Sequence, residues 1–243
     1  MKSRTTGKVY LVGAGPGDPE LITVKGLKLL QKADVVVYDF LIDKKLLAFA
    51  RKDAEMICVG KSSSFHTLKQ EEINKLLAEK ALQHTTVVRL KNGDPFIFGR
   101  GAEEAVYLAE RKIPFEVVSG VSSAIAVPAY AGVPLTHRDH ASSLAIITGH
   151  RRNDGEVKIV NADTLVFLMP VANLDRIAQK LLESGKSPET PCALIEKGTL
   201  AGQKVAQGNL GNISEISTTL GIKPPAVFVV GEVVNLRSGL GQS

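Results

Sequence analysis

Two ionisable side chains stand directly after apolar runs that are typical of buried strands. Asp39 follows residues 35–38, and Lys61 follows residues 57–60. In an open α/β sheet, ligands bind beyond the carboxyl ends of the strands, so we expect both side chains to face one cleft. A carboxylate and an ammonium placed there form either an acid–base pair or a simple salt bridge, and the sequence leaves both interpretations open.

A glycine-rich loop at residues 13–18 has the look of a nucleotide-binding loop but departs from it at two positions. The dinucleotide fingerprint G-x-G-x-x-G places its third glycine where Asp18 stands. Pro16 removes a backbone N–H that a phosphate would need, and the acid at the mouth of the loop repels phosphate. The loop predicts a nucleoside-like ligand without a pyrophosphate. A tight strand-to-helix turn without any ligand is the alternative.

A second glycine loop, at residues 91–101, follows the strand expected at residues 86–90. Asn92 and the glycine after it tolerate positive φ, and the glycines on either side of Arg100 let this residue approach a ligand closely. Asp94 is suited to accept hydrogen bonds from a ribose or an amino group. Glu103 lies in the first turn of the next helix, where an acid also stabilises the helix dipole. The loop predicts a ligand site, with a plain surface charge at Arg100 as the alternative.

Hydroxyl and basic side chains follow later in the chain. Ser122 and Ser123 stand at the start of a helix of small residues, where Ser122 either caps the helix or, with Ser123, faces an adenosine. Basic clusters at residues 136–140 and 150–152 lack the spacing of metal ligands, so we expect no metal. These clusters predict a cationic rim for a polyanionic substrate.

Composition narrows the classes of partner. The formal net charge is +5, but aromatic residues make up only 5% and alternate with no basic run, so we expect no nucleic acid. Cys58 and Cys192 each lie in an apolar segment, which predicts buried reduced thiols and favours the cytoplasm. The polar N-terminus lacks a signal peptide, and glycines and a proline interrupt the apolar stretch 117–133, so we expect no membrane span.

Short β-branched runs alternate with helical periods along the chain, which predicts α/β layers with a largely parallel sheet. Strands are expected at residues 9–12, 35–38, 57–59, 86–90, 115–118, 144–148, 165–169, 192–195, 204–207 and 226–230. Helices are expected at residues 21–33, 67–81, 102–111, 122–131, 174–182 and 210–220, with Thr67 and Gln70 as the capping box of the second. The rhythm restarts after residue 136, which predicts two α/β domains, 1–136 and 137–243.

The segments 12–19, 33–39, 88–104 and 132–138, in this order, resemble the tetrapyrrole (corrin/porphyrin) methylases, and the likeness runs over almost the whole chain. The resemblance implies two α/β/α domains with the active site in the cleft between them. It also implies S-adenosylmethionine as methyl donor, S-adenosylhomocysteine as product, and a homodimer. Within the family the likeness favours the branch that adds methyl groups at carbons 2 and 7 of uroporphyrinogen III, giving precorrin-2 for sirohaem and cobalamin.

The resemblance also implies roles for residues of this chain. The proton acceptor falls on Asp39, the proton donor on Lys61, and the substrate-handling pair on Arg100 and Glu103. The positions that contact the methyl donor fall on Pro16, Asn92, Gly93, Asp94, Ile97, Ser122, Ser123, Met169 and Gly198.

The sequence departs from the family pattern at a few of these positions. Asn92 stands where the family usually has glycine, and asparagine keeps access to the left-handed region. Ser122 and Ser123 stand where a Thr-Ala pair is common, so the first position keeps its hydroxyl. Two alternatives stay open: a later precorrin C-methyltransferase of the cobalamin pathway, and a non-catalytic nucleotide-binding module.

Overall fold

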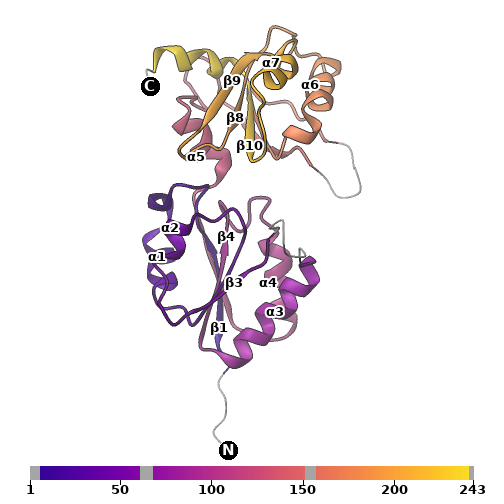
Figure 1. Cartoon of the computed structure of the whole chain (residues 1–243). Coiled ribbons are helices and arrows are strands. Elements are labelled where there is room, and N and C mark those ends of the chain that lie inside the picture. The colour runs from indigo at the N-terminus through magenta and orange to yellow at the C-terminus, as the bar shows by residue number, and fades with distance from the viewer. Residues whose placement is uncertain (1–5, 61–67, 151–156, 241–243) are drawn as a thin grey trace, which may run out of the picture. The chain divides into compact units, whose positions relative to one another are not determined.

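The chain divides into two compact units, Met1–Ser122 and Ser123–Ser243, in a computed structural model that describes residues 6–60, 68–150 and 157–240 (Figure 1). The division falls before helix α5 (Ser123–Tyr130), whereas the sequence predicted a boundary between residues 136 and 137. The difference has a packing cause. Ala124 and Val127 of α5 lie in the apolar core formed by the second sheet, beside Val166 and Ile195, so the helix belongs to the second unit.

Five parallel strands form the sheet of the first unit, in the order β3-β2-β4-β1-β5. In chain order they are β1 (Lys8–Gly13), β2 (Val35–Tyr38), β3 (Glu55–Cys58), β4 (Thr86–Lys91) and β5 (Phe115–Val118). The central strand β2 is a nearly continuous apolar run, as expected for a parallel sheet that is covered on both faces, whereas β4 carries two buried charged residues beside its apolar ones. The loops after β1, β2, β4 and β5 therefore meet at the carboxyl edge, where such sheets bind ligands.

Helices cover both faces of the first sheet. Figure 1 shows α1 (Val24–Leu30) and α2 (Lys44–Leu47) on one side and α3 (Gln70–Gln83) and α4 (Gly101–Glu110) on the other. Leu30 and Leu46 pack into the apolar core on the first side, and Leu77 and Leu108 pack into the core on the second. The helix expected at residues 21–33 is shorter, because the 3-10 turn η1 (Pro19–Leu21) precedes it and Thr23 caps α1.

The sheet of the second unit has the order β6-β7-β10-β8-β9. Its strands are β6 (Leu144–Thr148), β7 (Thr164–Leu168), β8 (Pro191–Glu196), β9 (Lys204–Asn209) and β10 (Ala226–Val230), with η3 (Val171–Asn173), α6 (Leu174–Glu183), α7 (Ile213–Thr219) and η4 (Glu232–Gly239) beside them. Only β6 and β7 pair in parallel among the strands of this unit that the structure describes. The prediction of a largely parallel sheet is thus confirmed for the first unit and wrong for the second. The connection of residues 197–203 is too short for a parallel crossover, so β8 and β9 pair as antiparallel neighbours.

The two cysteines differ in exposure. Cys192, on β8, is buried, and this burial raises the pKa of its thiol to about 12. Cys58 is exposed, so the prediction of a buried thiol is wrong at this position. It ends β3, an edge strand that pairs with a neighbour on one side only, which leaves an apolar run partly uncovered.

Two further expectations concern the ends and lengths of helices. Thr67, expected in a capping box, lies outside the described residues, and α3 is instead preceded by Lys69, whose backbone N–H donates to Glu72 Oε2 at 2.5 Å.

Across the described part of the chain, every helix is too short or too polar to cross a bilayer.

Candidate active site

Three loops meet at the carboxyl edge of the first sheet with only backbone between them. Gly13 ends β1, Gly93 follows β4, and Gly120 follows β5. A Cβ atom on Gly13 would lie 2.5 Å from Gly120 Cα and 2.6 Å from the carbonyl oxygen of Gly93. Gly15 and Gly93 also exchange two backbone hydrogen bonds, of 3.2 and 2.7 Å. We call Gly13, Gly93 and Gly120 the glycine junction, because only residues without a side chain allow this approach.

The acid at the mouth of the first loop caps the turn that follows it. Asp18 Oδ1 accepts the backbone N–H of Glu20 at 2.9 Å, and Pro19 contributes no N–H to this turn. Phosphate groups bind where the first N–H groups of a helix are free. This turn meets its own carboxylate instead, which fits the predicted ligand without a pyrophosphate.

Asp94 joins the second glycine loop to the end of β5. Its Oδ1 accepts the N–H of Phe96 at 2.8 Å, and its Oδ2 accepts the N–H of Gly120 at 3.0 Å. A carboxylate oxygen has room for a second hydrogen bond, so Asp94 keeps the capacity to accept one from a ligand. The positive φ expected at the Asn92–Gly93 turn falls on Gly93, at 67°.

The backbone around Arg100 is strained, but at positions the sequence did not indicate. Positive φ falls on Phe98 (52°) and Arg100 (59°), not on the glycines that flank Arg100. Those glycines serve close approach: a Cβ on Gly101 would lie 2.5 Å from the carbonyl oxygen of Pro95. Non-glycine residues in the left-handed region gather at functional sites, where the surrounding structure holds them.

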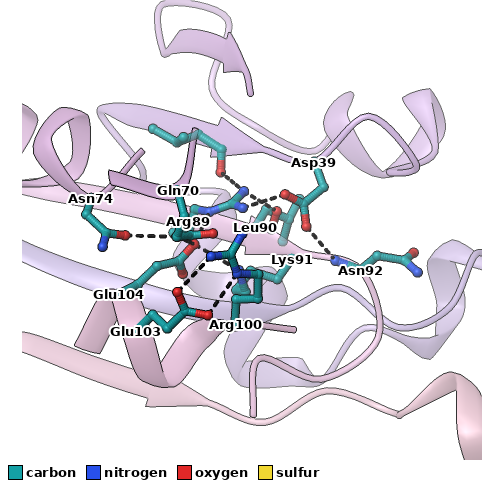
Figure 2. Close-up of polar contacts among 11 residues, drawn as sticks. Asp39, Gln70, Asn74, Arg89, Leu90, Lys91, Asn92, Arg100, Glu103 and Glu104 are labelled. Atoms are coloured by element: carbon teal, nitrogen blue, oxygen red, sulfur yellow. Dashed lines mark hydrogen bonds and ion pairs between the residues drawn. The ribbon is translucent and has the colours of Figure 1, made fainter. Parts of the chain in front are cut away.

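Arg100 and Glu103, predicted to handle the substrate, form a bidentate ion pair (Figure 2). Arg100 Nε donates to Glu103 Oε1 at 2.8 Å, and a terminal guanidinium nitrogen donates to Oε2 at 2.7 Å. The hydrogen bond to Glu103 raises the pKa of Arg100, which stays a cation. Both side chains are about half exposed, so the pair is open to a ligand.

A chain of buried ion pairs connects Glu104 of α4, through Arg89 of β4, with Asp39 (Figure 2). The guanidinium of Arg89 donates to Asp39 Oδ1, and its Nε donates to Glu104 Oε1 at 3.0 Å. Lys91 Nζ donates to the same Glu104 oxygen at 2.9 Å. The backbone N–H of Asn92 reaches Asp39 Oδ2 at 3.3 Å. We call Asp39, Arg89, Lys91 and Glu104 the charge quartet, with two positive and two negative members.

Burial and the negative charges nearby have opposite effects on the pKa values of Arg89 and Lys91, the two cations of the quartet. Burial alone would lower the pKa of Arg89, but the charges of Asp39 and Glu104 outweigh it, and the pKa is raised. For Lys91, burial and the positive charge of Arg89 lower the pKa against the pull of Glu104. The quartet therefore keeps Arg89 as the permanent cation beside Asp39.

Sequence reasoning missed three members of the quartet: Arg89, Lys91 and Glu104. The signal was present, since Arg89 and Lys91 alternate with Val88 and Leu90 in a run that otherwise forms a buried strand. Two charged residues at alternate positions of such a strand face the same side of the sheet. Their partner on α4 depends on how that helix packs, which the sequence does not state.

The other predicted site residues of the first unit lie on the loops that follow β1, β4 and β5, or outside the described part. Pro16 follows Gly15, which bonds to Gly93, and Ile97 is exposed in the loop before Arg100. Ser122 is buried at the end of the unit. Lys61, the predicted proton donor, lies outside the described residues, so its relation to Asp39 stays a prediction.

Three predicted donor-contacting residues belong to the second unit. Ser123 opens α5, Met169 follows β7, and Gly198 lies in the loop after β8. Because β7 and β8 both run antiparallel to β10, their carboxyl ends share one edge of the second sheet. Met169 is exposed with φ of 56°, and a Cβ on Gly198 would collide with the Val127 side chain of α5.

Fold and site together define an α/β protein whose glycine loops meet at the carboxyl edge of a parallel sheet, beside a cluster of buried charges that is open to solvent at Asp39. The family model of the Tetrapyrrole (Corrin/Porphyrin) Methylases matches residues 8–214, and the chain belongs to this family.

Two relatives and one solved structure illustrate the likeness. A uroporphyrinogen-III C-methyltransferase of Methanocaldococcus jannaschii is 56% identical, with 95% of this chain and 98% of the relative covered. A siroheme synthase of Pseudoalteromonas atlantica is 51% identical, and the match covers 96% of this chain but 52% of that protein. The structure of uroporphyrin-III C-methyl transferase from Thermus thermophilus complexed with S-adenyl homocysteine is 40% identical, covers 95% of this chain and 94% of that one, and gives a TM-score of 0.82.

Proposed function

We propose that this chain is an S-adenosylmethionine-dependent C-methyltransferase that methylates uroporphyrinogen III at carbons 2 and 7 to give precorrin-2. The observation that carries this function is the 56% identity, over nearly the full length of both chains, with a uroporphyrinogen-III C-methyltransferase. The site agrees with this function. In the first unit, the turn after the first glycine loop is capped by Asp18 rather than open to a phosphate, and the Asp39 carboxylate is partly exposed.

The residues present fit the methyl donor. S-adenosylmethionine carries a nucleoside and a sulfonium cation but no phosphate, and the turn after the first loop is capped by Asp18 rather than open to an anion. The glycine junction leaves backbone rather than side chains at this edge of the sheet. The residues that would hold the donor are Pro16, Asn92, Gly93, Asp94, Ile97, Ser122, Ser123, Met169 and Gly198.

When bound, the donor supplies a methyl group already activated by its positively charged sulfur, so no nucleophilic serine or cysteine is required. The chain must hold the attacking pyrrole carbon about 3–3.5 Å from this methyl group and in line with it. It must also accept the proton that the ring releases as its bonds rearrange. Asp39 takes this role because its carboxylate is held by Arg89 and is partly open to solvent.

Arg100 and Glu103 position the substrate. The planar guanidinium of Arg100 binds a substrate carboxylate in the same forked geometry with which it now binds Glu103. The net charge of +5 attracts a polyanionic tetrapyrrole over a longer range. Lys61 is the proposed proton donor.

Incubation with methyl-labelled S-adenosylmethionine and uroporphyrinogen III, followed by mass analysis, tests the function. We expect two added methyl groups per tetrapyrrole. Transfer only to an already methylated corrin precursor would replace this function with that of a later precorrin methyltransferase. Donor binding without any transfer would indicate a non-catalytic nucleotide-binding module.

We also infer a homodimer that works in the cytoplasm, as the family resemblance and the free cysteines favour. Light scattering during size-exclusion chromatography measures the oligomeric state, and a monomer at assay concentration would contradict the dimer.

A further inference from the structure

The charge quartet lies where the core should be apolar. Arg89 and Lys91 of β4 continue the row of inward positions that starts at Val87, whose side chain packs in the apolar core under α3 and α4 with Leu77. The sheet has strands on both sides of β4, so neither cation can reach water through a sheet edge. Replacing such buried ion pairs by apolar residues often leaves a protein as stable or makes it more stable. Stability alone therefore gives no reason for the quartet.

The quartet opens to solvent at one end only. The side chains of Arg89 and Lys91 are 3% and 2% exposed, and that of Glu104 is fully buried, whereas that of Asp39 is 32% exposed. Asp39 also stands at the carboxyl edge of the sheet, directly after β2. Asp39 is thus the member of the quartet that is open to solvent and placed to meet a ligand.

Glu104 is the buried end of the quartet. Its Oε1 accepts from Arg89 Nε at 3.0 Å, from Lys91 Nζ at 2.9 Å and from Gln70 Nε2 at 3.2 Å. Its Oε2 is buried and has no hydrogen-bond partner among the described residues. Gln70 is itself held by Asn74, at 2.9 Å. Oε1 therefore contacts both cations, while Oε2 has no hydrogen-bond partner in the described part of the chain. A buried oxygen without a partner costs free energy, so we infer that the charge of Glu104, and not its own hydrogen bonding, accounts for its position.

We propose that Glu104 is a positioning residue for methyl transfer, which holds Arg89 and thereby fixes the Asp39 carboxylate in one orientation. Lys91 balances the second negative charge, so that Asp39 and Arg89 form a one-to-one pair within a neutral quartet. The proposal rests on the proposed role of Asp39 as proton acceptor. Glu104 touches neither donor nor substrate, and it acts through Arg89.

Three variants test this assignment because they change the charge of the quartet in known ways. Glu104→Gln leaves one excess positive charge, Lys91→Met leaves one excess negative charge, and the double variant is neutral again. We expect each single change to lower kcat at least tenfold, with little change in the dissociation constant of S-adenosylhomocysteine. The double variant should recover kcat well above either single variant, because the amide side chain at position 104 still offers an oxygen to Arg89.

A merely structural role predicts a different result. If Glu104 only fills space, Glu104→Gln lowers the fraction of folded protein, while kcat per site that binds S-adenosylhomocysteine stays at the parent value. Additive losses in the double variant would also overturn the proposal, since independent sites add and coupled sites do not. Should Glu104→Gln fail to fold, Lys91→Met and the double variant decide alone: a double variant no faster than Lys91→Met refutes the coupling.

Matched controls separate this proposal from the proposed function. Glu110→Gln makes the same chemical change at an exposed position of α4 and should leave kcat unchanged. Formation of a doubly methylated tetrapyrrole by the parent chain, with loss of turnover in Asp39→Asn, establishes the function and the role of Asp39. Once the function and the role of Asp39 are established, full activity of the Glu104 and Lys91 variants would refute only the positioning role of Glu104.

Discussion

Arg100 combines a half-exposed guanidinium with a backbone conformation that few non-glycine residues adopt. Such strain amounts to roughly 1–3 kcal/mol and persists only where neighbouring groups hold the residue. Here the helix that starts at Gly101 and the ion pair with Glu103 hold it. A residue kept in this state is expected to act on a ligand rather than to stabilise the fold.

Arg100→Ala should lower turnover by about 100-fold or more, because the substrate loses its carboxylate partner and its alignment with the methyl group. Arg100→Lys should recover little, since an ammonium lacks the planar fork. Steady-state kinetics measures turnover, and calorimetry with S-adenosylhomocysteine should show donor binding nearly unchanged. Arg111→Ala, which removes an exposed arginine at the other end of α4, is the control. Full activity in Arg100→Ala would refute the assigned role.

The exposure of the two cysteines gives a second prediction. A thiol reagent should modify Cys58 of the folded protein and leave Cys192 unmodified, because Cys192 is buried and its pKa is raised to about 12, so little thiolate is present. Mass analysis of the labelled protein should show one modified thiol before denaturation and two after it. Modification of Cys192 at the rate of Cys58 would contradict the burial described for β8.

The place of a residue in the fold could be predicted where the strand pattern alone decides it. Asp39 directly follows β2 at the carboxyl edge of the first sheet, where the strand pattern placed it, whereas the roles of Asp39 and Arg100 stay predictions. Glu104 was missed because its first-turn position on α4 is also where an acid favours the helix dipole, and nothing local tells a buried acid from an exposed one. Glu103 and Glu104 are sequence neighbours, yet one is half exposed and the other fully buried.

At the scale of elements, the glycine junction fixes how the loops after β1, β4 and β5 approach one another. The strands and helices themselves were largely predictable, because hydrophobic periodicity is a local signal. The pairing direction of the second sheet was not. β10 comes last in the chain yet lies between β7 and β8, and the sequence holds no local sign of that insertion.

Gly120→Ala should disturb the junction, because the added Cβ would lie 2.6 Å from Gly13 Cα and neither backbone can yield. Overpacking of this kind costs about 1–3 kcal/mol of unfolding free energy. The variant should also lose affinity for S-adenosylhomocysteine as the loops move apart. Denaturant titration and calorimetry measure the two effects. Gly239→Ala, where a Cβ meets nothing within 4 Å, should change stability by less than about 0.5 kcal/mol.

On the scale of the whole molecule, each unit has its own apolar core and its own carboxylate of strongly lowered pKa. In the first unit, hydrogen bonds from Lys25 and Lys8 lower the pKa of Glu116 to about 2. In the second unit, hydrogen bonds from the side chains and backbone N–H groups of Ser143 and Ser142 lower the pKa of Asp163 to about 2.

The sequence placed the boundary between the two units at residue 136 because the residue pattern restarts there, whereas the packing of α5 places it before residue 123.

Acid should therefore destabilise both units within a defined range of pH. Asp163 has an ordinary pKa of 3.8 and a folded value of about 2, so its ionised form stabilises the fold above pH 4. This contribution declines as the pH falls from 4 to 2, where the folded carboxylate also takes up its proton. Asp163→Asn should lower the unfolding free energy at pH 7 and approach the parent value as the pH falls below 2, where both side chains are neutral. Urea titrations at several pH values measure this convergence. A constant difference between the two proteins from pH 7 to pH 2 would show that the four hydrogen bonds from Ser142 and Ser143 do not depend on the charge of Asp163.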